Sequence, residues 1–301
     1  MPESGGPTVE IAKTVEEVRR AVSAIREGGH PVGFVPTMGA LHEGHLSLVR
    51  FARRRGASVV VSVFVNPRQF GQGEDFGTYP RDRPRDLQLA EEAGASVFFA
   101  PSVPEIYPDG FATTVRVKPL EAGLCGRVRS GHFEGVATVV ATLLNIVRPD
   151  FSVFGEKDAQ QALIVKRLAA DLRLPGRILT APTVRESDGL AMSSRNAYLS
   201  PEERHAAAAI PRGIRAAEEL YASGERSAAQ LVSAVRSELA GEPLLSEEYV
   251  EIVDNETIGP WPGGDAPALL AVAVGVGAGR LIDNVSLGSA VADGDGTGEG
   301  S

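Results

Sequence analysis

Two histidines three residues apart are the first feature of this sequence that could carry out chemistry. His42 and His45 lie in the segment PTMGALHEGH (residues 36–45), where an apolar strand gives way to a helix. Residues at i and i+3 share one face of a helix, so both imidazoles can donate hydrogen bonds to phosphate oxygens and to charge that develops on them. A zinc protease needs His-Glu-x-x-His, with its histidines four residues apart, so the spacing speaks against zinc. Two surface histidines without a ligand are the simpler alternative.

A lysine occupies the corresponding place after a second strand. The chain has only four lysines, and Lys157 lies in FGEKDAQQ (residues 154–161), near the expected start of a helix. The positive end of a helix dipole disfavours a cation there unless an anion binds nearby. The position therefore predicts a phosphate ligand, although Asp158 is also a common type of helix N-cap.

Two polar loops offer further ligand groups. Ser193, Ser194 and Arg195 lie in a polar loop (residues 185–196) and suit a mobile segment that closes over a triphosphate. Asn66 and Gln69 follow the second strand, and their amides can bind a polar substrate beside the nucleotide. Each of these patterns is weak alone, since a serine-rich loop or a turn after a strand often has no further role.

Strand and helix patterns alternate over the first 180 residues. Apolar or β-branched runs predict strands at residues 32–36, 58–65, 96–100, 151–154 and 177–181. Helical spacing predicts helices at residues 44–55, 84–93, 135–148 and about 158–171. Such alternation is typical of a Rossmann-like, doubly wound α/β fold, whose parallel sheet binds ligands beyond the carboxyl ends of its strands. The histidines and the lysine are expected at that edge.

The pattern changes after residue 182. A loop rich in Ser, Asp and Gly (residues 183–200) leads to Ser200 and Pro201, a typical N-cap and first helical residue. Two alanine-rich helices are expected next, followed by strands at residues 249–254, 269–276 and 280–287. We therefore predict a Rossmann-like domain over residues 1–182, a smaller α+β lid domain over 183–287 and a disordered tail over 288–301.

The composition narrows the class of function. The chain has 301 residues, 43% of them hydrophobic, and a formal net charge of −9. Its basic residues are scattered among acidic ones, so a broad nucleic-acid footprint is not expected. Cys125 is the only cysteine, which excludes an intrachain disulfide. No segment has the apolar length of a membrane span or the pattern of a signal peptide, so we expect a cytoplasmic protein without membrane partners.

Several longer segments resemble the pantothenate synthetase family, the pantoate–β-alanine ligases of the nucleotidyltransferase superfamily with the His-x-Gly-His signature. In the family's order, over roughly residues 8–287, they are PTMGALHEGH, VSVFVNPRQFG, YPDGFATTV, GHFEGVATVVATLLNIVRPD, FGEKDAQQ, VRESDGLAMSSRN and YVEIVD. The resemblance implies an ATP-dependent ligation in two steps. The carboxylate of pantoate attacks the α-phosphorus of ATP, giving pantoyl adenylate and pyrophosphate; the amine of β-alanine then displaces AMP to give pantothenate.

The resemblance also implies roles for individual residues. The residues expected to act in catalysis are His42, His45 and Lys157. ATP is expected to contact Met38, His42, His45, Gly155, Lys157, Asp158, Val184, Met192, Ser193, Ser194 and Arg195, with Asp158 on the ribose. Pantoate is expected to contact Asn66, Gln69 and Gln161. Mg²⁺ is expected with the triphosphate, with no protein ligand assigned to it, and the protein is expected to be a homodimer.

Three positions depart from the family pattern. Ala159 stands where an aromatic residue is usual, Arg68 replaces a small or apolar residue, and Ser130 replaces the proline before Gly131. Ala159 predicts looser packing around Gln161 and weaker binding of pantoate. Two other functions stay open: nucleotidyl transfer onto a phosphorylated small molecule, which the histidine segment alone permits, and nucleotide binding without catalysis, motivated by Ala159.

Overall fold

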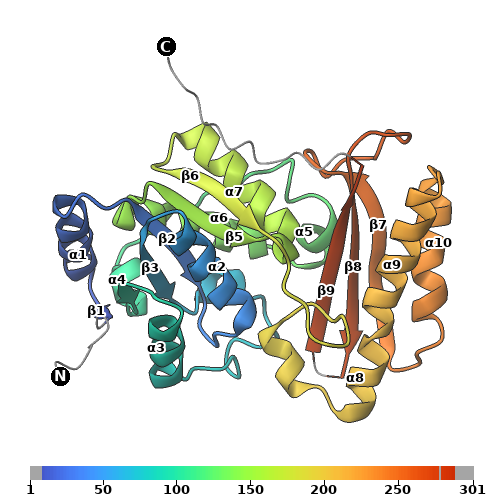
Figure 1. Ribbon diagram of the computed structural model, residues 1–301, viewed down its shortest axis with the longest axis horizontal. Helices are drawn as coiled ribbons and strands as arrows, with labels where there is room; N and C mark the ends of the chain where they lie inside the picture. The colour runs from blue at the N-terminus through green and yellow to red at the C-terminus, as the bar shows by residue number, and fades with distance from the viewer. Residues whose placement is uncertain (1–8, 278, 289–301) are drawn as a thin grey trace, which may run out of the picture.

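The computed structural model describes residues 9–277 and 279–288, which form two sheets packed with helices (Figure 1). The larger sheet has six parallel strands in the order β1-β4-β3-β2-β5-β6. Its strands are β1 (Glu10–Ala12), β2 (Val32–Thr37), β3 (Ser58–Val63), β4 (Val97–Phe99), β5 (Phe151–Gly155) and β6 (Arg177–Ala181). These strands are rich in β-branched and aromatic residues, which suit a sheet covered on both faces.

The strand order reverses between β2 and β5. From β2 the chain moves outward through β3 to β4, whereas β5 leads to β6 on the opposite side. Helix α2 (Glu43–Arg54) follows β2, and the short η2 (Glu156–Asp158) followed by α7 (Ala159–Leu172) follows β5. The helix starts after these two strands therefore flank one crevice at the carboxyl edge of the sheet, which is the usual ligand site in such folds.

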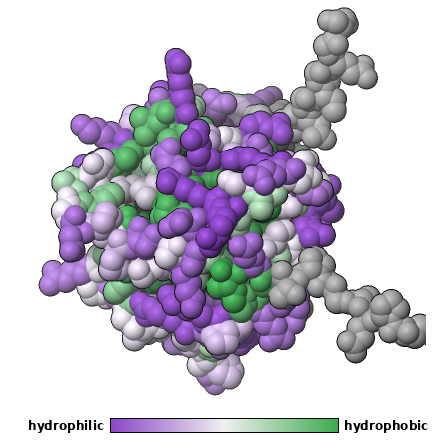
Figure 2. Space-filling model, turned by 90° about the vertical axis from the view of Figure 1, so that its left-hand side faces the viewer, coloured by the Kyte–Doolittle hydropathy of each residue, from purple (hydrophilic) through white to green (hydrophobic). Residues whose placement is uncertain are grey.

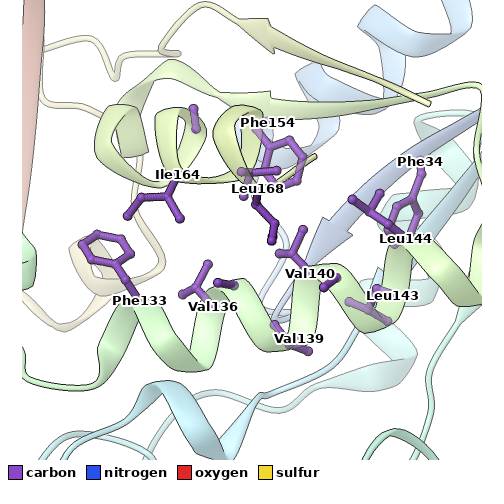
Figure 3. Close-up of a cluster of buried hydrophobic side chains, with 14 of the residues drawn as sticks. Phe34, Phe133, Val136, Val139, Val140, Leu143, Leu144, Phe154, Ile164 and Leu168 are labelled. Carbon is purple, nitrogen blue, oxygen red and sulfur yellow. The ribbon is translucent and has the colours of Figure 1, made fainter. Parts of the chain in front are cut away.

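Helices cover both faces of the larger sheet. Helices α1 (Val15–Glu27), α6 (His132–Val147) and α7 pack on one face, where Phe34 contributes to their core. Helices α2 and α3 (Arg83–Glu92) pack on the other face, against Val35 and its neighbours. Figure 3 shows the first core between α6 and α7, with Val136 and Val140 facing Ile164 and Leu168. The alternation of Phe34 and Val35 between the two cores is the two-residue period of a strand.

The smaller sheet is antiparallel, in the order β7-β8-β9, and consists of β7 (Leu245–Asp254), β8 (Ala268–Val276) and β9 (Gly279–Leu287). Helices α9 (Ala209–Ala222) and α10 (Ala228–Leu239) cover its outer face, with α8 (Pro201–Ala207) preceding them (Figure 1). Alternate residues of β8 serve the two faces: Leu270 packs in the core with α9 and α10, whereas Leu269 and Ala271 join the core of the larger sheet. The inner face of the smaller sheet therefore packs against the larger sheet and its helices.

The remaining short elements are η1 (Pro67–Gln69), α4 (Val103–Ile106), α5 (Leu124–Val128) and η3 (Ser194–Tyr198). Residues 66–69 and η3 contribute to the site described below, and α5 lies between the larger sheet and β7 (Figure 1).

The predicted α/β fold, with its parallel sheet and smaller α+β portion, is confirmed. The predicted strands and helices are present, and Ser200 caps α8 as expected, with its side chain accepting a hydrogen bond from the backbone N–H of Glu203. Three helices, rather than two, follow the polar loop, because Ala208 separates α8 from α9. The boundary between domains at residue 182 remains a prediction. All but the first residue of the predicted tail lies outside the described residues.

The surface is mixed in character. Figure 2 shows the face at the left of Figure 1, where hydrophilic side chains predominate and hydrophobic ones form small patches. No helix within the described residues is both long and apolar enough to cross a membrane.

Candidate active site

A cavity of about 770 Å³ lies at the carboxyl edge of the larger sheet, between the helix starts after β2 and β5, residues 64–79, the polar loop and the smaller sheet. The cavity is lined by every residue for which a role was predicted: Met38, His42, His45, Asn66, Gln69, Gly155, Lys157, Asp158, Gln161, Val184, Met192, Ser193, Ser194 and Arg195. Four segments that are distant in sequence, residues 38–45, 66–69, 155–161 and 184–195, thus meet in one place. What each side chain can do there depends on its partners.

The turn before the histidines is fixed by hydrogen bonds to backbone amides. Asp86 of α3 accepts hydrogen bonds from the backbone N–H groups of Ala40 and Leu41, at 3.1 and 2.7 Å. Gly39 has φ +89°, and a Cβ at this position would lie 2.9 Å from Asp86 Oδ2. The glycine is therefore needed for the turn itself.

The two histidines form a reciprocal cap at the start of α2. His42 Nδ1 accepts a hydrogen bond from the backbone N–H of Gly44 at 3.1 Å, and His45 Nδ1 accepts one from the backbone N–H of His42 at 3.4 Å. Because each Nδ1 is an acceptor, the proton of each neutral ring must be on Nε2. The ring centroids are 4.1 Å apart, so two Nε2–H donors are held side by side.

Both rings are neutral near pH 7. Burial, with a smaller contribution from the charge of Lys157, lowers the pKa of His42 to about 4. Burial also holds the pKa of His45 well below its usual 6.5, and the charges of His42 and Lys157 act in the same direction. The histidines therefore present hydrogen-bond donors without a positive charge, so charge neutralisation is left to the nearby lysine.

Lys157 belongs to η2, just before α7, as the sequence predicted. Its Nζ lies 3.6 Å from Asp158 Oδ1, and the lysine side chain is 19% exposed. Asp158 occupies the N-cap position of α7, as its alternative interpretation predicted, but its side chain makes no capping hydrogen bond. Asn284 of β9 donates hydrogen bonds to the carbonyls of Glu156 and Lys157, at 3.1 and 2.7 Å. The smaller sheet thus holds the segment that carries the lysine.

Asn66 and Gln69, the two amide residues after β3, differ in the hydrogen bonds that their side chains make. Asn66 is 1% exposed, and its Nδ2 donates to Gln69 Oε1 and to the carbonyl of Gly135. Asn66 Oδ1 accepts from the backbone N–H of Arg68 and from the hydroxyl of Tyr107. Gln69 Nε2 donates to the sulfur of Met38, at 3.0 Å. Asn66 thus holds the segment, while Gln69 presents its side chain to the cavity.

The polar loop is tied to its surroundings mainly by side chains. Arg195 pairs with Asp75 through two hydrogen bonds of 3.1 and 3.0 Å. Tyr79, near Asp75 in sequence, is buried, which raises its pKa, although a hydrogen bond with Ser194 opposes this shift. These contacts connect residues 75–79 with residues 194–195 at the cavity.

Further contacts shape the base of this loop. Arg204 of α8 bonds to Glu186 at 2.6 Å and to Asp188 at 2.8 Å. Arg185 forms an ion pair with Asp283 of β9 at 2.6 Å, and the aspartate side chain is 1% exposed. The loop is therefore anchored to both α8 and the smaller sheet, while its arginine at residue 195 faces the cavity.

The structure explains one of the three departures from the family pattern. The guanidinium of Arg68 lies 4.7 Å from the ring centroids of both Tyr107 and Phe111, so it packs in a cation–π arrangement outside the cavity lining. Ser130 is exposed in the turn before α6, and nothing in the structure explains the serine. Ala159 lines the cavity as the first residue of α7, two residues before Gln161.

Sequence reasoning missed a second polar cluster in the cavity wall. Glu74, Arg129 and His132 line the cavity. Glu74 pairs with Arg129, while Arg129 and His132 bond to each other and to the backbone carbonyl of Gln69. His132 lies in the segment GHFEG, to which no role was assigned. The one available signal was the presence of a histidine, one of five in the chain, at the start of a predicted helix.

No group of three or more His, Cys, Asp or Glu side chains in the described part of the chain is arranged to hold a metal ion. Among the described residues, four acids line the cavity, and each has a basic partner: Glu74 pairs with Arg129, Asp75 with Arg195, Asp158 with Lys157 and Asp283 with Arg185. Magnesium usually keeps several waters and binds through substrate phosphates with one or two carboxylates. These residues therefore suit magnesium that arrives on a nucleotide better than a resident ion.

Known proteins resemble the chain along nearly all of its length. The model of the pantoate-beta-alanine ligase family matches residues 10–286. Pantothenate synthetase from Pelotomaculum thermopropionicum is 51% identical over 278 residues, covering 92% of this chain and 99% of the relative. Its counterpart from Myxococcus xanthus is 52% identical over 283 residues, covering 92% of this chain and 96% of the relative.

Solved structures give the same result. The crystal structure of pantothenate synthetase from Thermus thermophilus matches with a TM-score of 0.87 and 48% identity, covering 92% of this chain and 99% of that one. Pantoate-beta-alanine ligase from Francisella tularensis, solved in complex with beta-gamma ATP and beta-alanine, matches with a TM-score of 0.75 and 32% identity, covering 92% and 97%. This chain therefore belongs to the pantoate–β-alanine ligase family.

Proposed function

We propose that this protein joins pantoate to β-alanine with consumption of ATP, through a pantoyl adenylate, and releases AMP and pyrophosphate. The observation that carries the proposal is the meeting of neutral histidine donors, a lysine, hydroxyls with an arginine, and amides in one cavity of a chain that belongs to the ligase family. The alternatives of nucleotidyl transfer and of binding without catalysis lack comparable support, because the family match spans residues 10–286.

The first step needs alignment and charge stabilisation more than proton transfer. A carboxylate with a pKa of about 4 is already ionised near neutral pH, so it can attack the α-phosphorus without a general base. We assign the Nε2–H groups of His42 and His45 to phosphate oxygens, where they stabilise charge as the new P–O bond forms. Lys157 supplies the positive charge that these neutral rings lack.

Gln69 and Gln161 are the proposed direct contacts of pantoate. Both line the cavity, and their amides match the hydroxyls and carboxylate of the acid. Asn66 is proposed to act through Gln69, because its own donors and its carbonyl are already engaged. Apolar cavity residues such as Val140 and Phe154 suit the methyl groups of the acid.

The nucleotide is proposed to lie along the helix starts and the polar loop. Met38, Gly155, Val184 and Met192 are assigned to its pocket, and Asp158 to the ribose. The phosphates are assigned to Ser193, Ser194 and Arg195, since two hydroxyls and a guanidinium supply several donors. Magnesium would arrive on the triphosphate as part of the substrate and neutralise its charge, and no protein ligand is assigned to it.

The second step requires a deprotonated amine. An amine with a pKa of about 10 arrives mainly protonated, so it must lose a proton before it attacks the acyl carbonyl. His42 and His45 are poor bases here, because their Nδ1 atoms are occupied and their Nε2 atoms carry protons. We assign the proton to the adenylate phosphate or to water; the C–N bond then forms as the C–O bond to AMP breaks.

Exchange of labelled pyrophosphate into ATP tests the adenylate step. With pantoate, ATP and Mg²⁺ but no β-alanine, the protein is expected to catalyse pantoate-dependent exchange, followed by equal amounts of AMP and amide once β-alanine is added. The variant Lys157→Ala is expected to lose at least about 10²-fold in rate. Lys118 is an exposed lysine outside the cavity, so Lys118→Ala serves as the matched control.

Retention of the AMP moiety in the product would support nucleotidyl transfer instead. ATP and pantoate binding without exchange would support a binding protein.

The assembly and location are proposed from the family resemblance alone. We expect a cytoplasmic homodimer, and light scattering after size exclusion at micromolar concentration measures its mass directly. A monomer over this range would contradict the proposed dimer.

A further inference from the structure

Two side chains, His132 and Arg129, contact the backbone carbonyl of Gln69, and a third, Glu74, holds Arg129. His132 Nδ1 lies 2.8 Å from the carbonyl oxygen of Gln69, and Arg129 Nη2 lies 3.4 Å from the same atom. Arg129 Nη1 lies 3.1 Å from His132 Nε2. Glu74 accepts two hydrogen bonds from Arg129, at 2.8 and 2.6 Å. We call these three side chains the Gln69 bracket.

The geometry determines the protonation of His132. A guanidinium can only donate, so His132 Nε2 must accept from Arg129, and the ring proton must be on Nδ1. His132 Nδ1–H therefore donates to the carbonyl of Gln69. Burial, with a contribution from the charge of Arg129, also lowers the pKa of His132 to about 4, so the ring is neutral near pH 7.

Glu74 keeps Arg129 in this position. The hydrogen bonds from Arg129 lower the pKa of Glu74 to about 2, and the two side chains are only 16% and 26% exposed. A guanidinium with a bidentate carboxylate partner has its direction fixed and its charge largely balanced. Arg129 is therefore positioned to hold His132 and Gln69.

The opposite side of the Gln69 segment is held just as closely. A Cβ at Gly135 of α6 would lie 2.3 Å from the carbonyl oxygen of Arg68 and 2.6 Å from the backbone nitrogen of Gln69. The helix therefore packs directly on the backbone of this segment. Asn66 donates to the Gly135 carbonyl at 3.1 Å, so side chain and helix together leave Gln69 little freedom.

We propose that His132 and Arg129 are positioning residues for the acid substrate: they fix the backbone of Gln69 so that its side-chain amide points into the cavity in one orientation. This inference rests on the proposed role of Gln69 in binding pantoate. A misplaced ligand group weakens binding even when all contacts remain chemically available. Loss of the bracket should therefore raise the KM for pantoate much more than the KM for ATP.

Two substitutions of His132 separate positioning from general structural support. Asn Nδ2 is the same number of bonds from the backbone as His Nδ1, so His132→Asn keeps the donor to Gln69. Gln Nε2 corresponds to His Nε2, so His132→Gln loses that donor. We expect His132→Gln to raise the KM for pantoate about ten-fold, as for the loss of one buried hydrogen bond, and His132→Asn to stay within about two-fold of the parent. Both should leave the KM for ATP within about two-fold.

Arg129→Lys is a second variant, which keeps a charge but loses the fixed paired donors; it should raise the KM for pantoate several-fold. His205→Gln, at an exposed histidine of α8, is the matched control. Equal effects of His132→Asn and His132→Gln, or equal increases in both KM values, would overturn the proposal.

Amide hydrogen exchange over residues 66–70 of the full chain provides a readout that needs no substrate. Exchange should be faster in His132→Gln than in His132→Asn, and equal rates in the two would contradict the bracket. Absence of pantoate-dependent pyrophosphate exchange in the parent protein would instead contradict the proposed function. The two failures are therefore distinguishable.

Discussion

The two sides of the cavity hold their functional groups by different kinds of bond. On the sheet side, residues 38–45 and 66–69 are fixed by hydrogen bonds that involve the backbone, as in the pairing of His42 with Gly44 N–H and of His132 with the Gln69 carbonyl. On the loop side, Arg195 is held by another side chain, Asp75, and both are partly exposed, at 25% and 32%.

The difference has a consequence for substrate binding. The groups on the sheet side are in position before the substrate binds, whereas Arg195 on the loop side can exchange its carboxylate partner for a phosphate. A backbone amide remains in place when a ligand binds, so the Nε2–H groups of His42 and His45 need no rearrangement. Arg195 and Asp75 are both partly exposed, so solvent screens their ion pair, and a phosphate can replace the carboxylate of Asp75 with the same paired hydrogen bonds. The carboxylate of Asp75 thus resembles, in charge and geometry, the phosphate that Arg195 is proposed to bind.

The largest effect is expected on the sheet side, at His45. His45→Ala removes a fixed Nε2–H donor and should lower kcat by about 10²–10³-fold, as for other donors to transition-state charge. His45→Gln retains a donor at the position of Nε2 and should recover part of the rate, whereas His45→Asn should not. Single-turnover formation of adenylate measures the step directly. Equal rates for the glutamine and asparagine variants would contradict the assigned tautomer.

The next effect is expected on the loop side. Arg195→Ala removes the proposed phosphate donor and should lower kcat/KM for ATP by about 10²-fold, within the range for charge-assisted hydrogen bonds. Arg54→Ala, at an exposed arginine in the last turn of α2, controls for the loss of a positive charge. The KM for pantoate should change little. An equal loss for both substrates would show that this loop does more than bind phosphate.

The neutral histidines also predict a dependence of stability on pH. The folded pKa of His42 is about 4, below the usual 6.5, so the unfolded state binds more protons between these values and stability falls as pH decreases. Between pH 7 and pH 5 the loss for this residue is about 2 kcal/mol. Glu74 has a lowered pKa too, but its stabilisation is lost only below about pH 4.5.

Denaturant unfolding at several pH values measures this dependence. His42→Gln should reduce the change in unfolding free energy between pH 7 and pH 5 by about 2 kcal/mol. His205→Gln, at an exposed histidine of α8, is the matched control. An unchanged pH dependence in His42→Gln would show that the ring is not held neutral by the fold.

The sequence predicted which segments meet but not which atoms bond. The periodic patterns around His42 and Lys157 predict a strand followed by a helix in each case. In a parallel sheet, ligands bind at the carboxyl edge where the strand order reverses, so both residues are expected at that edge. Helix α1 was missed, although Thr14 and Glu17 form a capping box that sequence alone can indicate.

Contacts between distant side chains could not be predicted in the same way. Arg195 and Asp75 are 120 residues apart, and His132 and Gln69 are 63 apart, so no local period relates them. The tautomers depend on hydrogen bonds that exist only in the fold. The full engagement of Asn66 likewise follows from its position beneath α6 and could not be deduced from the amide side chain itself.

The smallest expected effect is on the loop side. It tests whether Asp75 positions Arg195 for the nucleotide or occupies the place of the phosphate until ATP binds. Asp75→Asn removes the charge that competes with phosphate for Arg195, so the KM for ATP should fall by about two- to five-fold, as expected for an ion pair that contributes up to about 1 kcal/mol. Asp171→Asn breaks a surface pair of similar length, with Arg167 at 2.9 Å, outside the cavity, and should leave the KM unchanged. A rise in the KM for ATP in Asp75→Asn would mean that Asp75 positions Arg195 for the nucleotide. Arg195 would then be in place before ATP binds, like the histidines on the sheet side. A fall would identify Asp75 as an occupant that the triphosphate displaces.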